Sequence, residues 1–189
     1  ERHPVLTFAG PYDNAQVKAP IRRELAREGQ VFFVHNRVGT IEKTAAQLRG
    51  LIPEARIVTA HGQMNERQLE QVMLDFWERR ADVLVCTTII ESGLNIQSAN
   101  TLIIDHADKL GLSQLHQLRG RVGRGAHESS CVLIYAGPLG EIARQRLKII
   151  YENTDGFEIA RQDLQIRGPG EFVGEMGLFI ETERRGVAL

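Results

Sequence analysis

The segment at residues 114–124, QLHQLRGRVGR, places three arginines and two glycines within six consecutive positions. A guanidinium group is permanently charged and meets phosphate oxygens as a fixed two-pronged donor. Gly120 and Gly123 remove side chains that would hinder the approach of this loop to a ligand. Arg121 and Arg124 are three residues apart and would point the same way in a helical turn. The segment therefore predicts a phosphate-binding loop that includes Arg119, Arg121 and Arg124.

Two other motifs follow predicted strands. In AHGQMNERQ, Gly62 would let a phosphate approach closely, and the free amides of the helix start favour an anion. A tight turn at His61 and Gly62 explains this motif equally well. In CTTIIESGLN, the hydroxyls of Thr87 and Thr88 stand at a strand end, where they could hold nucleic-acid phosphates. A capped loop is an equal alternative for that segment.

Several common sites have no matching motif in the sequence. No GxxxxGK[ST] phosphate loop occurs, and no acidic pair follows a strand as a magnesium site would require. The six histidines lack the close spacing of a zinc site, so no metal site is predicted. No GxGxxG follows the first strand, which argues against a Rossmann-type enzyme. The arginines are therefore expected to act on a nucleotide that another domain holds.

The composition limits the partners and the location of the protein. With 23 basic and 24 acidic residues the net charge is −1, so contacts with nucleic acid must be local rather than due to a general positive field. No apolar run approaches the roughly 18 residues that span a bilayer, and no membrane association is expected. Cys86 and Cys131 each lie in an apolar run, which favours buried free thiols and a cytoplasmic location.

The positions of these motifs depend on the predicted elements. Short β-branched runs alternate with helical patterns, which is typical of an α/β fold with a mostly parallel sheet flanked by helices. The strands are expected at residues 5–10, 30–36, 55–61, 82–88, 101–107 and 130–136. Ligands of such sheets bind at the carboxyl ends of the strands. Because four polar segments follow strands, we expect them to meet at one edge of the sheet.

The remaining helices set the domain boundaries. Proline is tolerated at the first position of a helix, so we expect the first helix to begin near Ala19, just before Pro20, and to end before Gly29. After residue 137 the helical periodicity is interrupted at residues 153–156, which predicts a helical hairpin. The predicted division is therefore a sheet domain at 1–137, a hairpin at 138–175 and a tail at 176–189.

Three longer strings carry a family resemblance: HGQM, VLVCTTIIESGLNIQSANTLII and ADKLGLSQLHQLRGRVGR. They resemble the second RecA-like motor domain of superfamily-two DNA translocases, and above all the families of transcription-repair coupling factors (Mfd) and RecG helicases. The resemblance covers residues 1–175. It implies a RecA-like, P-loop NTPase-type fold and an ATP-dependent double-stranded DNA translocase or helicase of DNA repair. ATP and Mg²⁺ would be bound mainly by a first motor domain absent from this chain, so the isolated chain is expected to be inactive.

The resemblance also assigns roles to residues. Those implied to act on the γ-phosphate are Gln117, Arg121 and Arg124. Those on the nucleotide side are Gly93, Asn95, Gly120 and Gly123. Those implied to contact DNA are Asn36, Arg37, His61, Gly62, Gln63, Thr87 and Thr88. Those of the hairpin that would couple ATP turnover to DNA movement are Arg146 and Arg167.

The chain departs from the family pattern at two positions. Asn95 stands where the family usually has aspartate, and Gly177 stands where the family hairpin continues into a glutamine. The implied partners are double-stranded or branched DNA and the first motor domain. For a coupling factor they include RNA polymerase and excision-repair proteins, contacted through other domains. The alternative hypothesis is a non-catalytic nucleic-acid-binding module that retains the helicase fold.

Overall fold

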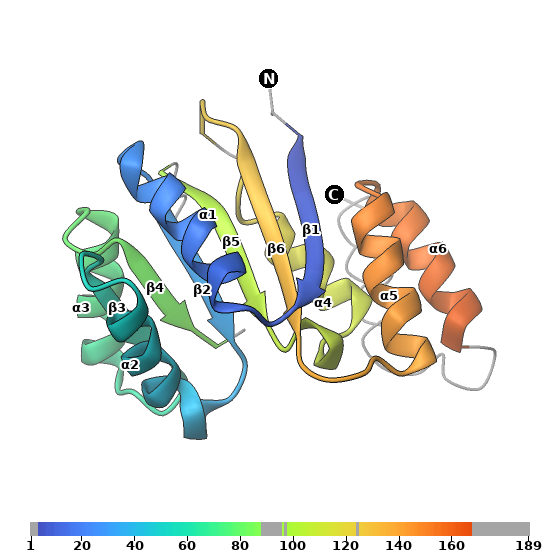
Figure 1. Ribbon diagram of the computed structural model, residues 1–189, viewed down its shortest axis with the longest axis horizontal. Coiled ribbons are helices and arrows are strands. Elements are labelled where there is room, and N and C mark those ends of the chain that lie inside the picture. The colour runs from blue at the N-terminus through green and yellow to red at the C-terminus, as the bar shows by residue number, and fades with distance from the viewer. Residues whose placement is uncertain (1–3, 88–95, 97, 124, 168–189) are drawn as a thin grey trace.

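The computed structural model describes residues 4–87, 96, 98–123 and 125–167. Its centre is a six-stranded sheet with the order β1-β6-β5-β2-β4-β3 (Figure 1). Every pairing between neighbouring strands is parallel. The strands are β1 (Val5–Pro11), β2 (Gln30–His35), β3 (Ile57–Ala60), β4 (Val83–Cys86), β5 (Ala99–Asp105) and β6 (Ser129–Tyr135). The predicted α/β fold with a parallel sheet is confirmed.

Helices cover both faces of this sheet (Figure 1). They are α1 (Asn14–Ala26), α2 (Ile41–Leu51), α3 (Glu66–Trp77), α4 (Leu112–Arg119), α5 (Glu141–Glu152) and α6 (Gly156–Arg167), with short 3-10 turns η1 (Val38–Thr40) and η2 (Ala107–Lys109). None of the helices in the described ranges combines the length and the apolar character that a membrane crossing needs.

The alternation of side chains along β2 shows why two layers form. Val31 and Phe33 pack into a core with α1 and α2, whereas Phe32 and Val34 pack into a second core with α3, α4 and the hairpin. Successive side chains of a strand point to opposite faces, so a strand covered on both faces is apolar throughout. All residues of β2 are accordingly buried.

The expected start of the first helix is wrong. Helix α1 begins at Asn14, five residues before Ala19, and Pro20 lies inside it. The Asp13 carboxylate accepts a hydrogen bond from the Ala15 amide at 2.8 Å and so caps the earlier start. A proline inside a helix costs about 3 kcal/mol. Val17 and Ile21 are both fully buried, and burial of two such side chains contributes about 1.5–3 kcal/mol each, which offsets that cost.

The predicted helical hairpin is present as α5 and α6, with its break at the expected residues. Asp155 precedes α6 and accepts a hydrogen bond from the Phe157 amide at 2.9 Å, which explains why a helix restarts there. Leu147 and Ile159 are buried in the same core as one face of the sheet. The hairpin therefore packs directly on the sheet domain, beside β1 and α4 (Figure 1). The residue boundaries proposed for the domains stay a prediction.

Candidate functional site

The carboxyl ends of the strands meet at one edge of the sheet because all strands run in the same direction. Asn36 and Arg37 follow β2 directly, and both are exposed. Gly62 and Gln63 follow β3 and are also exposed, while His61 is half-buried. Strand β4 lies between β2 and β3, so these two segments flank the end of β4. The structure thus gathers five of the residues implied to contact DNA along one edge.

Local hydrogen bonds shape the segment after β3. The Met64 amide donates to the His61 carbonyl at 3.1 Å, which closes a tight turn. Asn65 then begins α3 with a capping box: its side chain accepts from the Gln68 amide at 2.9 Å, and the Gln68 side chain accepts from the Asn65 amide at 3.1 Å. The tight turn that the sequence allowed is therefore present, and it leaves Gly62 and Gln63 on the surface.

Thr87 follows β4 at the same edge but is only 3% exposed. Its amide donates to the Ala60 carbonyl at 3.3 Å, which continues the pairing between β3 and β4. In this structure the Thr87 side chain is therefore covered rather than presented to solvent. Thr88, Gly93 and Asn95 lie outside the described residues.

The arginine segment continues from helix α4. Gly120 ends the helix, and its amide donates to the His116 carbonyl at 3.1 Å. Val122 is 2% exposed and anchors the following turn, on which Arg121 is exposed. Gly123 has a φ of +83°, a left-handed conformation that favours glycine, so this glycine allows the chain to turn after Val122. Gln117 is exposed on the last turn of α4, and Arg124 lies outside the described residues.

Arg119 does not share the exposure of Arg121, and its expected role in phosphate binding is corrected. It is 4% exposed, and its guanidinium donates to the carbonyls of Ile150 and Asn153 and, at 3.4 Å, to the hydroxyl of Thr7. Those two carbonyls lie at the carboxyl end of α5, where a helix leaves acceptors without partners and carries partial negative charge. Arg119 therefore caps α5 and fastens α4 to the hairpin. Burial lowers the pKa of its guanidinium.

The two arginines assigned to the hairpin are placed differently. Arg146 lies on α5 and is half-buried, and its Nε atom is buried without a hydrogen-bond partner among the described residues. Arg167 is the final residue of α6, and its side chain lies outside the described part of the structure.

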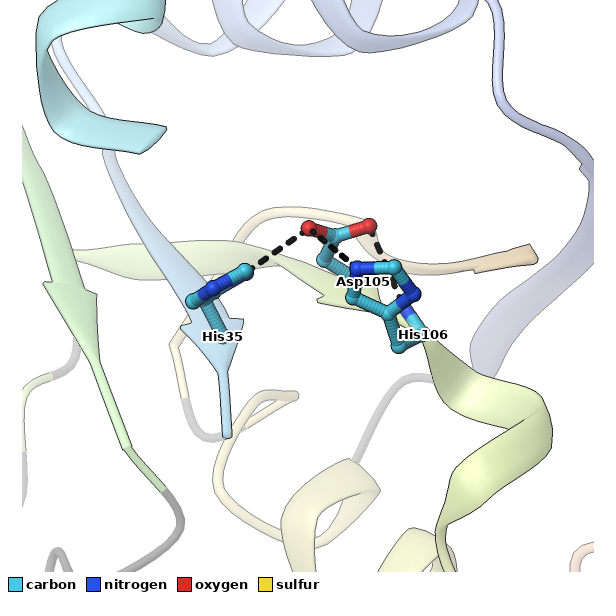
Figure 2. Close-up of side chains that lie close together, drawn as sticks. All are labelled: His35, Asp105 and His106. Carbon is cyan, nitrogen blue, oxygen red and sulfur yellow. Dashed lines mark hydrogen bonds and ion pairs between the residues drawn. The ribbon is translucent and has the colours of Figure 1, made fainter. Parts of the chain in front are cut away.

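A cluster of three side chains at the same edge was not foreseen from the sequence. His35 closes β2 and Asp105 closes β5, and His35 Nδ1 lies 2.8 Å from Asp105 Oδ2 (Figure 2). His106 follows directly, and its Nε2 lies 3.8 Å from the same oxygen. His106 has a left-handed backbone with a φ of +52°. The histidines look scattered in the sequence, and the only hint of this cluster is that two predicted strands end near a histidine.

Both cysteines are free and buried, in agreement with the sequence interpretation. Burial raises the pKa of Cys131 to about 12, and the charge of Arg119 opposes part of that rise. Burial also raises the pKa of Cys86. Because a raised pKa keeps both thiols protonated, neither is suited to act as a nucleophile.

Near the edge of the sheet, burial and the carboxylate of Asp105 raise the pKa of Tyr12.

Residues 16–126 match the helicase conserved C-terminal domain, which is more than half of the chain. The chain belongs to this family. As a helicase C-terminal domain it is 53% identical over 179 residues to the transcription-repair-coupling factor of Mycobacterium bovis, covering 92% of this chain and 14% of that protein. It is 51% identical over 176 residues to the transcription-repair-coupling factor of Escherichia coli, covering 90% of this chain and 15% of that protein.

Solved structures agree with this assignment. RecG bound to a three-way DNA junction matches the helicase C-terminal domain with a TM-score of 0.77 and 41% identity, covering 90% of this chain and 23% of RecG. The C-terminal domain of Dbp5 from S. cerevisiae matches with a TM-score of 0.60 and 13% identity, covering 87% of this chain and 97% of that domain. The second match supports the fold alone. The RecA-like fold and the superfamily-two family membership expected from the sequence are confirmed.

Proposed function

We propose that this chain is the second motor domain of an ATP-dependent double-stranded DNA translocase that acts in DNA repair. The observation that carries the proposal is the gathering of the exposed residues after β2 and β3 at the carboxyl edge of a parallel sheet, together with the exposed Arg121 after α4. The expectation that the arginine segment meets these loops at the same edge is wrong, because Gly120 and Gly123 line a pocket with Pro4 and Val5 at the start of β1. Relatives named transcription-repair-coupling factor share about half of the residues of this domain. The chain spans only 14–15% of the length of those relatives, so the proposed activity is that of a longer protein to which this domain contributes.

In this proposal the γ-phosphate of ATP faces Arg121 and Arg124, with Gln117 and the glycines at 93, 120 and 123 near the nucleotide. A first motor domain would hold ATP and Mg²⁺, since no GxxxxGK[ST] sequence occurs here. Arginines supplied across a domain interface stabilise the charge that develops during phosphoryl transfer, with effects of about 10³–10⁵ on the rate. Closure of the two domains would therefore bring the arginines to the phosphate.

DNA would lie along the carboxyl edge of the sheet. The exposed side-chain amides of Asn36 and Gln63 and the guanidinium of Arg37 can position a phosphate backbone without a large net charge, as a chain of net charge −1 requires. The seven residues implied to contact DNA are Asn36, Arg37, His61, Gly62, Gln63, Thr87 and Thr88, of which Thr87 would need to become accessible. Arg146 and Arg167 would transmit ATP turnover through the hairpin.

The partners of the whole protein follow from the relatives. The name transcription-repair-coupling factor suggests contacts with RNA polymerase and excision-repair proteins through other domains, in the cytoplasm. The RecG structure contains a branched DNA, which suggests that branched DNA is a substrate worth testing beside a plain duplex.

The test is DNA-stimulated ATP hydrolysis by this chain joined to the first motor domain of the M. bovis relative. Arg121→Ala and Arg124→Ala are each expected to lower the rate by two or more orders of magnitude, because each removes a positive charge that stabilises the negative charge of the transition state. Arg22→Ala is the matched control, since Arg22 pairs with Glu54 on the surface and such pairs contribute little.

An inactive parent that still folds and binds DNA would overturn the motor proposal. That result would favour the non-catalytic binding module, for which the substitution at Asn95 is the supporting feature. Full activity in both arginine variants would instead remove the arginines from the mechanism.

A further inference from the structure

The cluster formed by His35, Asp105 and His106 takes no part in the function proposed above. One nitrogen from each imidazole and one carboxylate oxygen all lie within 4.8 Å of one another, and His35 is buried (Figure 2). Histidine nitrogens and carboxylate oxygens are the ligands that transition metals bind in proteins. We propose that these three side chains form a binding site for one divalent transition-metal ion of the zinc class.

The distances in the cluster are close to those that such an ion requires. In a tetrahedral zinc site the metal–ligand bonds are about 2.0–2.1 Å, so ligand atoms lie about 3.3 Å apart. His35 Nδ1 is 2.8 Å and His106 Nε2 is 3.8 Å from Asp105 Oδ2, so each of these two pairs differs from that separation by about half an ångström, and the ligand atoms of the two histidines lie within 4.8 Å of each other. The His106 side chain is 29% exposed, so its ring has room to move toward His35.

The surroundings of His35 favour the orientation that a metal ligand needs. Its Nε2 lies 2.6 Å from the hydroxyl oxygen of Thr40, on the side of the ring away from Asp105. A histidine that binds metal through one nitrogen characteristically donates the other N–H to a fixed partner, which sets its tautomer and holds the ring in place. With Nε2–H donated to Thr40, the Nδ1 lone pair faces the carboxylate. In the metal-free chain the other neutral tautomer serves the same two contacts, with Nδ1–H donating to Asp105 and Nε2 accepting from the Thr40 hydroxyl, so metal binding would require a change of tautomer in which Thr40 becomes the acceptor.

The ligand set also indicates which ions fit. Two imidazole nitrogens and one carboxylate suit Zn²⁺, Co²⁺ or Ni²⁺, whereas Mg²⁺ and Ca²⁺ prefer oxygen ligands. Three protein ligands leave a coordination position for water. Asp105 also lines a cavity of about 410 Å³ with Tyr12, Asn14, Thr44 and Gln47. Solvent therefore has space beside the carboxylate.

A metal here would join the segment after β2 to the segment after β5. His35 directly precedes Asn36 and Arg37, and His106 leads through η2 to α4, which carries the arginine turn. The binding proposal itself does not depend on the function proposed above, because metal binding can be measured without ATP or DNA. Failure of one proposal therefore leaves the other intact.

The experiment titrates the metal-free 189-residue chain with Zn²⁺ by calorimetry at pH 7.5, and with Co²⁺ by absorption spectroscopy. We expect one ion per chain and no absorption band from thiolate ligation, since both cysteines are buried elsewhere. His106→Asn is expected to weaken Zn²⁺ binding at least tenfold. Asparagine tolerates the left-handed backbone at this position, so the fold should be retained.

His127→Asn is the matched control, because His127 is exposed in the segment before β6 and lies outside the cluster. It should bind Zn²⁺ as the parent does, and Mg²⁺ should not compete. His35→Gln is a second test of the proposed ligands and should also weaken Zn²⁺ binding at least tenfold. The proposal is overturned if the parent does not bind Zn²⁺, if His106→Asn binds it as tightly as the parent, or if a thiolate band appears.

Discussion

Arg119 and Arg121 are two positions apart, yet the first is 4% exposed and the second lies on the surface. The difference follows from their partners. Arg119 satisfies carbonyls at the end of α5, whereas Arg121 stands on the turn that follows the glycine at the end of α4. Composition alone assigns both to phosphate binding, because an arginine that caps a helix and one that meets a phosphate use the same donors.

At the residue scale we predict that Arg119→Met lowers the free energy of unfolding by about 2–4 kcal/mol. The substitution keeps an extended side chain but leaves the carbonyls of Ile150 and Asn153 without a donor, and a buried polar group without a partner costs about 1–3 kcal/mol. Urea unfolding followed by circular dichroism measures the change. Arg22→Met, on the surface, should stay within about 0.5 kcal/mol of the parent. Equal stability of the two variants would contradict the capping role of Arg119.

At the scale of elements, the contact between α4 and α6 is set by a glycine. A Cβ atom at Gly156 would lie 2.6 Å from His116 Nε2 on α4, closer than real Cβ contacts allow. Because Arg119 donates to carbonyls at the end of α5 and His116 packs against α6, helix α4 touches both helices of the hairpin. The arginine turn and the hairpin are therefore held together by packing as well as by the chain.

We predict that Gly156→Ala lowers the free energy of unfolding by about 1–3 kcal/mol, because the added methyl group overlaps the half-buried His116 ring and that ring must leave its packed position between α4 and α6. The matched control is Gly50→Ala in α2, where nothing lies within 4 Å of the added Cβ. That change should stabilise the chain by roughly 0.5–1 kcal/mol through helix propensity. Thermal unfolding of both variants measures the contrast. A stabilising Gly156→Ala would show that the hairpin is not closely docked.

At the scale of the whole molecule, the chain contains one side of the proposed nucleotide site and about one seventh of the length of its relatives. Its net charge of −1 provides no general attraction for DNA. DNA binding should therefore depend on the few residues at the carboxyl edge of the sheet and on further domains.

We predict that the purified 189-residue chain releases no phosphate from ATP above the rate without protein, with or without DNA, because it has no phosphate loop of its own. Phosphate release measured by a coupled assay tests this expectation. Hydrolysis that disappears in Arg121→Ala would contradict the division of the site between two domains.

The sequence by itself determined the sheet, the order of its motifs and the family. Strands buried on both faces are nearly continuous apolar runs, and the run Val31–Val34 predicts such a strand without knowledge of its neighbours in the sheet. Only the tertiary structure decided what depends on distant partners. Helix α1 starts at Asn14 because Val17 is buried against the sheet, and Arg119 caps a helix that begins over twenty residues later. His35 and Asp105 meet because β2 and β5 are adjacent in the sheet. Contacts across 70 positions are fixed by strand order, which no local pattern contains.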